Sequence, residues 1–380
     1  RSIWVTGVQT CALPIYAAVE VGELEEEEVE ETPDGSADLE IQVSLPATLE
    51  VNKEQAEQFL VALSSCRLPV SFELIGLPHS IIVQFACATR DRLTLRQQLR
   101  AYFPDAVLTE STDFLTRHWT MPSVHSMLVI DFGLSHEFMR PLRTFRGFGI
   151  DPLIAVCGAL SDLEDGEIAT VQLLFSRARH PWGTSIMRCV TDYEGGAFFA
   201  DAPEMTRLAA DKIARPLFAA ALRVGIRSPD PDRAWDIARA LSGAFVQFGE
   251  PRSNELIPLS PDGLDEREQV LALLDRTTYR SGMLLNSEEL VSFVHLPSVS
   301  VRSAKLARRA TRTKAAPAIA RGSGLILGEN HHEGATRASS PLPPTSACAT
   351  RTSSEPREPV SPHCSIWRSE ERRVGKECRS

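Results

Sequence analysis

Residues 69–88 read PVSFELIGLPHSIIVQFACA, and this stretch decides the fold of the first part of the chain. Pro69–Leu77 and Ile81–Ala88 are apolar runs of strand length, and the three residues between them, Pro78-His79-Ser80, form a turn sequence. The stretch therefore predicts a β-hairpin.

The segments on both sides of this hairpin extend the pattern. A half-buried strand is predicted where apolar and polar residues alternate, at Leu39, Ile41, Val43 and Leu45. Asn52 can cap a helix that presents one apolar face, made of Ala56, Phe59, Leu60 and Leu63. Asp91–Phe103 is a second helix and Ala106–Thr109 a last strand. The order β-α-β-β-α-β predicts a ferredoxin-like α+β domain over residues 38–120, a fold that hosts many functions.

A second α+β sandwich is predicted over residues 121–265. Its strands are expected at Met127–Phe132, Ile168–Phe175, Pro216–Ile226 and Leu256–Leu259, the last an edge strand because Pro258 has no N–H. Its helices are expected at Asp151–Leu163, Trp182–Thr191, Pro203–Ile213 and Asp232–Phe248, so the two middle ones form a helical insertion. A helical segment, 266–300, follows with helices at Glu266–Arg276 and Ser287–Val294. The fold class is therefore α+β, with two consecutive α/β sandwich domains.

Composition describes an ordinary globular chain: 380 residues, a net charge of -10, 43% hydrophobic and 24% charged residues. No apolar run approaches the roughly 18 residues that span a bilayer. Four cysteines in the body, Cys66, Cys87, Cys157 and Cys189, are widely spaced and form no C-x-x-C pair. Such cysteines are typical of small buried side chains in a reducing compartment, with a metal or disulfide role as the alternative.

Two segments have unusual charge. Residues 17–37 are glutamate-rich and predict a solvated acidic linker, with a partner-binding acidic tail as the alternative. Residues 301–337 form a basic linker in which no acid occurs between Val301 and Arg321. Its basic residues include Arg302, Lys305, Arg308, Arg309, Arg312 and Lys314. These side chains are candidates for contact with nucleic acid or phosphate, or else the segment is a solvated arm between domains.

No catalytic or metal-binding set is predicted. His331-His332-Glu333 is interpreted as a polar turn, because adjacent side chains cannot converge on one ion without ligands from elsewhere. Asp131-Phe132-Gly133 copies the kinase magnesium tripeptide, but no glycine-rich loop accompanies it, so it is interpreted as a strand end. The printed sequence contains no G-x-x-x-x-G-K-[ST] and indicates no small-molecule substrate.

Both ends of the chain resemble translated sequencing adapters. VTGVQTCALPI (Val5–Ile15) and RSEERRVGKECRS (Arg368–Ser380) carry this resemblance, so residues 1–16 and 368–380 are expected to be artefacts and the natural termini to be missing. Residues 338–367 are interpreted as a frameshifted tail. A shift of one nucleotide near residues 337–339 would let the codons from Glu355 onward read G-A-S-G-T-G-K-S-T-L-L-N, a P-loop.

Several long segments of the body resemble one bacterial family. They are FELIGLPHSIIVQFAC (Phe72–Cys87), VIDFGLSHEFMRPLRTF (Val129–Phe145), DPLIAVCGALSDLEDGE (Asp151–Glu167), RHPWGTSIMRCVTD (Arg179–Asp192), FFADAPEM (Phe198–Met205) and SGMLLNSEELVSFVHLPS (Ser281–Ser298). The family is that of the large ATPases of conjugative DNA transfer and type IV secretion, similar to coupling-protein and HerA/FtsK-like motors. LGENHHEG (Leu327–Gly334) resembles the joint ahead of their nucleotide-binding core.

This resemblance implies an accessory N-terminal module from which the ATPase core is missing. For the intact parent it implies ATP and Mg as cofactors, DNA and the secretion machinery as partners, homo-oligomers, and a place in the cytoplasm at the inner membrane face. The fragment itself is expected to have no enzyme activity. The alternative is a stand-alone, non-enzymatic protein-interaction module.

Overall fold

The computed structural model describes residues 37–120, 126–179, 181–261, 263–280, 282–309, 325–329 and 339–342. The chain divides after Ala310 into two units. In the second unit the described residues form one hairpin, β11 (Leu325–Glu329) with β12 (Ser339–Leu342). The structure does not describe residues 1–36, Arg312, Lys314 or the predicted turn at His331-His332-Glu333. Of residues 338–367, interpreted as a frameshifted tail, it describes only the backbone of β12.

The first half of the first unit follows the predicted order of elements. It contains β1 (Leu39–Pro46), α2 (Lys53–Leu63), β2 (Val70–Leu77), β3 (Ser80–Cys87), α3 (Arg92–Tyr102), β4 (Val107–Ser111) and a short α4 (Phe114–Trp119). The hairpin of β2 and β3 is confirmed, and Asn52 caps α2 by accepting a hydrogen bond from the Gln55 amide at 2.9 Å. The strands lie in the order β4-β1-β3-β2, and each neighbouring pair is antiparallel.

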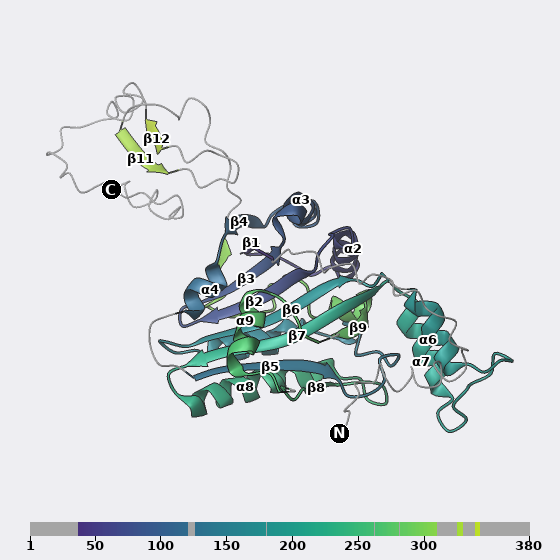
Figure 1. The fold of residues 1–380 in the computed structure, drawn as a ribbon. Helices are drawn as coiled ribbons and strands as arrows, with labels where there is room; N and C mark the ends of the chain where they lie inside the picture. Colours follow the sequence, from purple (N-terminus) through teal and green to yellow (C-terminus); the bar gives the residue numbers. More distant parts are fainter. Residues whose placement is uncertain are drawn as a thin grey trace, which may run out of the picture. The chain divides into compact units, whose positions relative to one another are not determined.

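The second half repeats this arrangement. It contains β5 (Ser126–Leu134), α5 (Leu153–Ser161), β6 (Ile168–Arg177), α6 (Trp182–Val190), α7 (Glu204–Ile213), β7 (Leu217–Ser228), α8 (Pro231–Phe245) and β8 (Leu256–Pro258). Its strands lie in the order β8-β5-β7-β6, again antiparallel. Helices α6 and α7 form the insertion between β6 and β7, and they project beyond the end of the sheet (Figure 1).

The two halves share one sheet. Strand β2 pairs antiparallel with β6, from Val70 opposite Phe175 to Gly76 opposite Ala169. Each of these strands would otherwise expose an edge of unpaired N–H and C=O groups, and the pairing satisfies both edges. The α+β class is therefore confirmed, with a single, mostly antiparallel sheet that continues across the position where the sequence predicted a domain boundary (Figure 1).

Helices cover both faces of this sheet. The main core lies under α2, α3, α5 and α8, and it includes Phe59 against Phe85 and Phe132 against Phe245. On the opposite face, α4 and α9 (Glu266–Leu274) enclose a smaller cluster of Ile75, Leu115, Trp119, Ile168, Val270 and Leu273. Both halves of the chain contribute to each core.

Residues after α9 complete the sheet and correct part of the sequence interpretation. The segment predicted to be helical contains a strand, β9 (Met283–Asn286), before the short α10 (Ser287–Leu290). β9 pairs with the first residues of β7, which β5 does not reach. Periodicity missed β9 because a four-residue strand is too short for a recognisable alternation.

The start of the basic segment is also part of the sheet. Strand β10 (Arg308–Arg309) pairs parallel with Leu45 and Pro46 of β1, and Leu306 forms a parallel bridge with Ile81 of β3. Residues 306–309 therefore fill the gap where the end of β1 separates from the start of β3. Within the described residues, no helix is long and apolar enough to cross a membrane.

Candidate functional site

The predicted basic residues have different environments in the structure. Lys305 donates from Nζ to the carbonyl of Leu163 at 2.9 Å. Arg308 donates to the carbonyls of Pro46, Pro297 and Val301 at 3.3–3.4 Å and also to that of Ser298. Burial lowers the pKa of Arg308. These two side chains fasten the segment to the body, whereas Arg302 is exposed.

Arg309 contributes backbone to β10, and its side chain lies outside the described residues together with those of Arg312 and Lys314. The structure therefore does not bring the six predicted residues together into one surface. Among the described side chains, Arg302 is the candidate that lies open to a phosphate.

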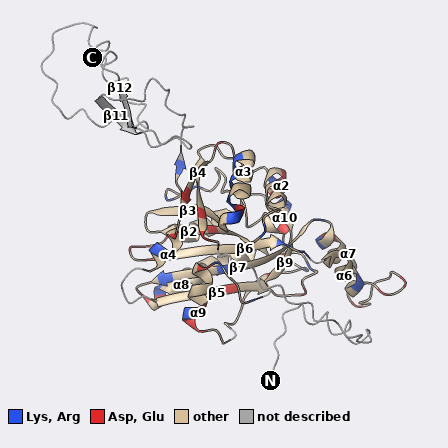
Figure 2. Cartoon of the chain, turned by 45° about the horizontal axis from the view of Figure 1, so that its top comes forward, with Lys and Arg blue, Asp and Glu red and all other residues tan. Residues whose placement is uncertain are grey.

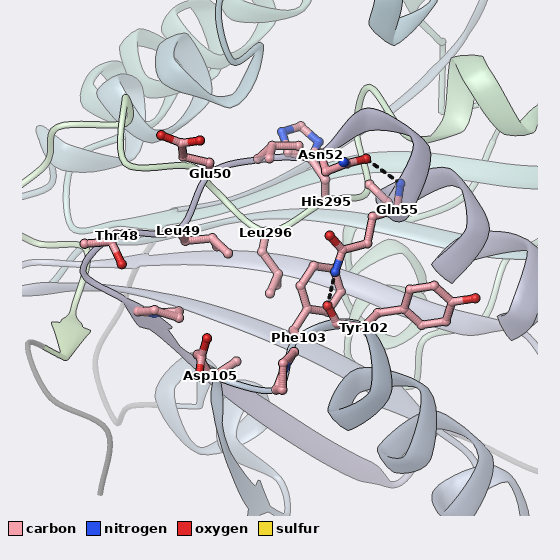
Figure 3. Close-up of a pocket in the computed structure, with 15 residues that line it drawn as sticks. Thr48, Leu49, Glu50, Asn52, Gln55, Tyr102, Phe103, Asp105, His295 and Leu296 are labelled. Carbon is pink, nitrogen blue, oxygen red and sulfur yellow. Dashed lines mark hydrogen bonds between the residues drawn. The ribbon is translucent and has the colours of Figure 1, made fainter.

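A pocket of about 260 Å³ lies beside this anchored segment (Figure 3). Its walls are the loop from Pro46 to Asn52, the end of α3 and the residues His295 and Leu296. Gln55 spans it by donating to the carbonyl of Tyr102 (Figure 3). Its lining carries the acids Glu50 and Asp105 and contains no Lys or Arg, so its chemistry does not suit a phosphate.

His295, which lines this pocket, forms a buried ion pair with Asp151. Nε2 of His295 lies 3.0 Å from Oδ1 of Asp151, and Nδ1 lies 2.8 Å from the Val291 carbonyl. The Asp151 carboxylate and the Val291 carbonyl are both acceptors, so each faces a ring nitrogen that can donate to it. Burial opposes ionisation of Asp151, but bonds from His295 and Ser298 outweigh it and hold its pKa below the ordinary range. The pair joins residues 295–298, which we call the HLPS segment, to the start of α5.

The described hydrogen-bonding groups around this pair are engaged with one another. The Ser298 hydroxyl shares a hydrogen bond of 2.6 Å with the Ser300 hydroxyl, and both His295 nitrogens are occupied. Among the described residues, no group of three or more His, Cys, Asp or Glu side chains could hold a metal ion. Cys87 and Cys157 are buried and Cys66 and Cys189 half-buried, and burial raises the pKa of Cys66, Cys87 and Cys157 to about 12.

Several charged side chains line a groove of about 620 Å³. We call it the arginine groove after its four cationic residues, Arg143, Arg207, Arg215 and Arg252. They come from the loop after β5, from both ends of α7 and from the loop before β8. Three acids share the lining: Asp211, Glu250 and Glu288.

Three of the groove's four arginines form ion pairs that are partly exposed. Arg207 lies 2.9 Å from Asp211, Arg215 lies 2.9 Å from Glu288, and the Arg143–Glu250 separation is 3.5 Å. Such partly exposed pairs contribute only about 0–1 kcal/mol. Arg252 is exposed, has a left-handed backbone with φ 69°, and forms no ion pair with a described residue. The groove can therefore take up an acidic partner at little loss.

A buried ion pair joins the elements that line this groove. Lys212 donates to Glu289 at 2.8 Å, and neither side chain is exposed. Glu289 also accepts from the backbone amides of Leu142 and Asn286 at 2.7 and 2.8 Å. Burial lowers the pKa of Lys212, and Glu289 counteracts that shift. These contacts join α7, α10 and the loop after β5.

Sequence reasoning did not predict the arginine groove. Its four arginines are spread over more than one hundred residues, and each occurs in a segment of mixed charge with no motif. The one available signal is the cluster of Arg140, Arg143 and Arg146 in a loop rich in proline and glycine.

Comparisons with known proteins assign no family. No family model and no curated protein sequence matches the chain. One solved structure with a partial likeness is the glycopeptide hexose oxidase DBV29 complexed with teicoplanin, with a TM-score of 0.27 and 12% identity. The likeness covers 73% of this chain and 56% of that protein, and at this TM-score it carries no argument about function.

Proposed function

We propose that the chain is an accessory N-terminal module of an ATPase of type IV secretion or conjugative DNA transfer. The observation that carries the proposal is the anchoring of residues 305–309 onto the body by β10, Lys305 and Arg308. The start of the basic segment is thereby fixed to the sheet as far as Arg309. This attachment suits a module that positions a motor domain.

The finer features of the proposal concern the intact parent. It binds ATP and Mg through the P-loop of the shifted reading frame, moves DNA, and assembles as a homo-oligomer with the secretion machinery at the cytoplasmic face of the inner membrane. In this proposal the module is two ferredoxin-like units joined at β2 and β6, and the strand order of each half supports that interpretation.

Retranslation of the source DNA beyond Arg337, followed by expression of both forms, tests the proposal. We expect residues 17–337 to show no ATP turnover and the extended protein to hydrolyse ATP in the presence of DNA. The matched control replaces the P-loop lysine of the shifted frame, and its activity should be lost. A stop codon soon after Arg337 would favour a stand-alone, non-enzymatic interaction module, which the accessible arginine groove also suits.

DNA contact by the basic segment has a separate test. Because Lys305 and Arg308 are engaged with carbonyls, we expect Arg302→Ala to weaken DNA binding and to lower the salt slope by about 1. The control is Arg239→Ala, an exposed arginine paired with Asp236 on α8. An unchanged salt slope in the Arg302 variant would exclude this residue as a phosphate contact.

A further inference from the structure

The loop between α6 and α7 carries exposed aromatic residues at the far end of the insertion. We call residues 191–204 the insertion tip. Tyr193 is 106% exposed, and Phe198, whose ring packs edge-to-face against Phe199, is 57% exposed. Folded proteins bury most large aromatic side chains, and an exposed pair on a projecting element marks a surface for interaction.

Hydrogen bonds hold the insertion tip in one conformation. Asp192 accepts from the amides of Glu194 and Gly196 at 2.9 and 2.7 Å, and its own amide donates to the Gly196 carbonyl at 2.9 Å. Gly195 has φ +84°, a conformation that a side chain would strain. The Phe198 amide donates to the Val190 carbonyl at 2.9 Å, which joins the turn to the end of α6. Because the turn is preorganised, binding through it loses little conformational entropy.

The charge of the insertion tip selects its partner. The segment contains four acids and no Lys or Arg; the acids are Asp192, Glu194, Asp201 and Glu204. Figure 2 shows acidic positions in red along the loop beyond α6 and α7. Such a surface repels DNA phosphates and anionic lipid headgroups, and it attracts a basic protein surface.

The arginine groove is a surface of the complementary kind on the same chain. Its four arginines exceed its three acids, and its volume of about 620 Å³ accommodates aromatic side chains. No residue of the insertion tip lines the groove of its own copy, and Tyr193 makes no contact that covers it. The groove is therefore open to the tip of another molecule.

We propose that the insertion tip of one copy docks into the arginine groove of a second copy, with Tyr193 and Phe198 as apolar anchors. The acids of the tip pair with Arg252, which has no ion-pair partner among the described residues, and with Arg207, where they replace the weak pair with Asp211. Because tip and groove are different surfaces, two copies can dock reciprocally as a closed pair or head-to-tail as a ring or open chain, and the tip–groove contact is the same in each. The inference holds whether or not an ATPase follows the module.

Sedimentation velocity on the whole chain tests this docking over about 1 to 100 μM, a range that suits a transient interface. We expect concentration-dependent association that salt weakens. Replacement of both anchors, Tyr193→Ser with Phe198→Ser, should raise the dissociation constant about tenfold or more. The matched control is Leu93→Ser, which removes a 71% exposed apolar side chain from α3.

A mixing experiment identifies the two contacting surfaces. Arg252→Glu combined with Arg207→Glu should abolish association, as the anchor variant does. An equimolar mixture of the anchor variant and the groove variant should form heterodimers and no larger species, because one intact groove and one intact tip remain. A chain that stays monomeric throughout, or a mixture that does not associate, would overturn the proposal.

Discussion

Glu73 lies in the centre of β2, where its side chain has no exposed surface. Its carboxylate accepts from Ser71, Gln84 and Gln172 and pairs with Arg276 at 2.7 Å. Arg276 also pairs with Glu40 at 2.6 Å. Burial opposes ionisation of Glu73, but Arg276, Gln84 and Ser71 outweigh it and hold the pKa of Glu73 below its ordinary value. Its ionised form therefore stabilises the fold.

We predict that Arg276→Met lowers the free energy of unfolding at pH 7 by about 3–5 kcal/mol, because it leaves two buried carboxylates unpaired. In the unsubstituted chain, the pKa of Glu73 is lower in the folded state than in the unfolded state. Its contribution to the free energy of unfolding is therefore present above about pH 4.3 and is lost as the pH falls through the folded pKa. In the variant, desolvation dominates, and acidification from pH 7 to 5 should relieve part of the loss.

Urea denaturation at pH 7, 5 and 4 measures this prediction. Arg239→Met is the control, since its exposed pair with Asp236 should contribute little at any pH. Equal losses in the two variants, or a loss in Arg276→Met that grows on acidification to pH 5, would contradict the prediction.

Replacement of glycine by alanine should have opposite effects on stability at Gly225 and Gly243. A Cβ at Gly225 would overlap Leu273 of α9 and lie 2.9 Å from Trp119 of α4. Gly243, inside α8, has no atom within 4 Å of the added Cβ. Gly225→Ala should therefore lower the free energy of unfolding by about 1–3 kcal/mol. Gly243→Ala should raise it by about 0.5–1 kcal/mol, measured by urea denaturation. A stabilised Gly225→Ala would mean that α9 does not pack against β7.

At the scale of elements, the two-residue strand β10 fastens the start of the basic segment to the sheet. Two residues cannot form a stable strand alone, so side chains must hold β10 in place. Arg308 does this by donating hydrogen bonds to the carbonyls of Pro46 in β1 and of Pro297 and Ser298. The Ile81 amide donates to the Lys305 carbonyl at 2.7 Å, so the same segment also completes the start of β3.

We predict that Arg308→Met releases this segment from the sheet. Hydrogen bonds to a charged group contribute about 1.5–3 kcal/mol, so exchange of the Ile81 amide should become about ten- to a hundredfold faster. Native-state hydrogen exchange measures this effect, with Arg302→Met as the control because Arg302 is exposed. Unchanged protection of Ile81 in the Arg308 variant would show that β10 is held by other contacts.

At the scale of the whole molecule, the seam between β2 and β6 makes the two halves interdependent. The main core includes Phe85 from the first half and Phe245 from the second, and the sheet continues between them. Local unfolding of either half would expose the paired edge of the other.

We therefore predict one cooperative unfolding transition for residues 37–309. Phe85→Ala and Phe245→Ala should each destabilise that same transition by about 3–5 kcal/mol. Differential scanning calorimetry checks this, and two resolved transitions, each shifted by one variant alone, would refute it. The exposed Leu93→Ala is the control and should leave the transition in place.

Local patterns in the sequence determined the α+β class, most strand positions, the Asn52 cap and the position of the helical insertion. These features depend on the alternation or helical spacing of apolar side chains within about ten residues, so they can be predicted from the local sequence. Short elements such as α4, β9 and β10 were not predicted, because they contain too few residues to show a hydrophobic period.

Only the tertiary structure decided how the elements join and where charges meet. Arg276 and Glu73 are 203 residues apart, and Arg308 reaches Pro46 across 262 residues. Periodicity reports which face of an element is buried, but it holds no information on which strand edge pairs with which. The β2–β6 seam, the arginine groove and the anchored basic segment therefore follow from long-range packing. The hairpin at residues 69–88 follows from its own residues, because its strands are neighbours in sequence.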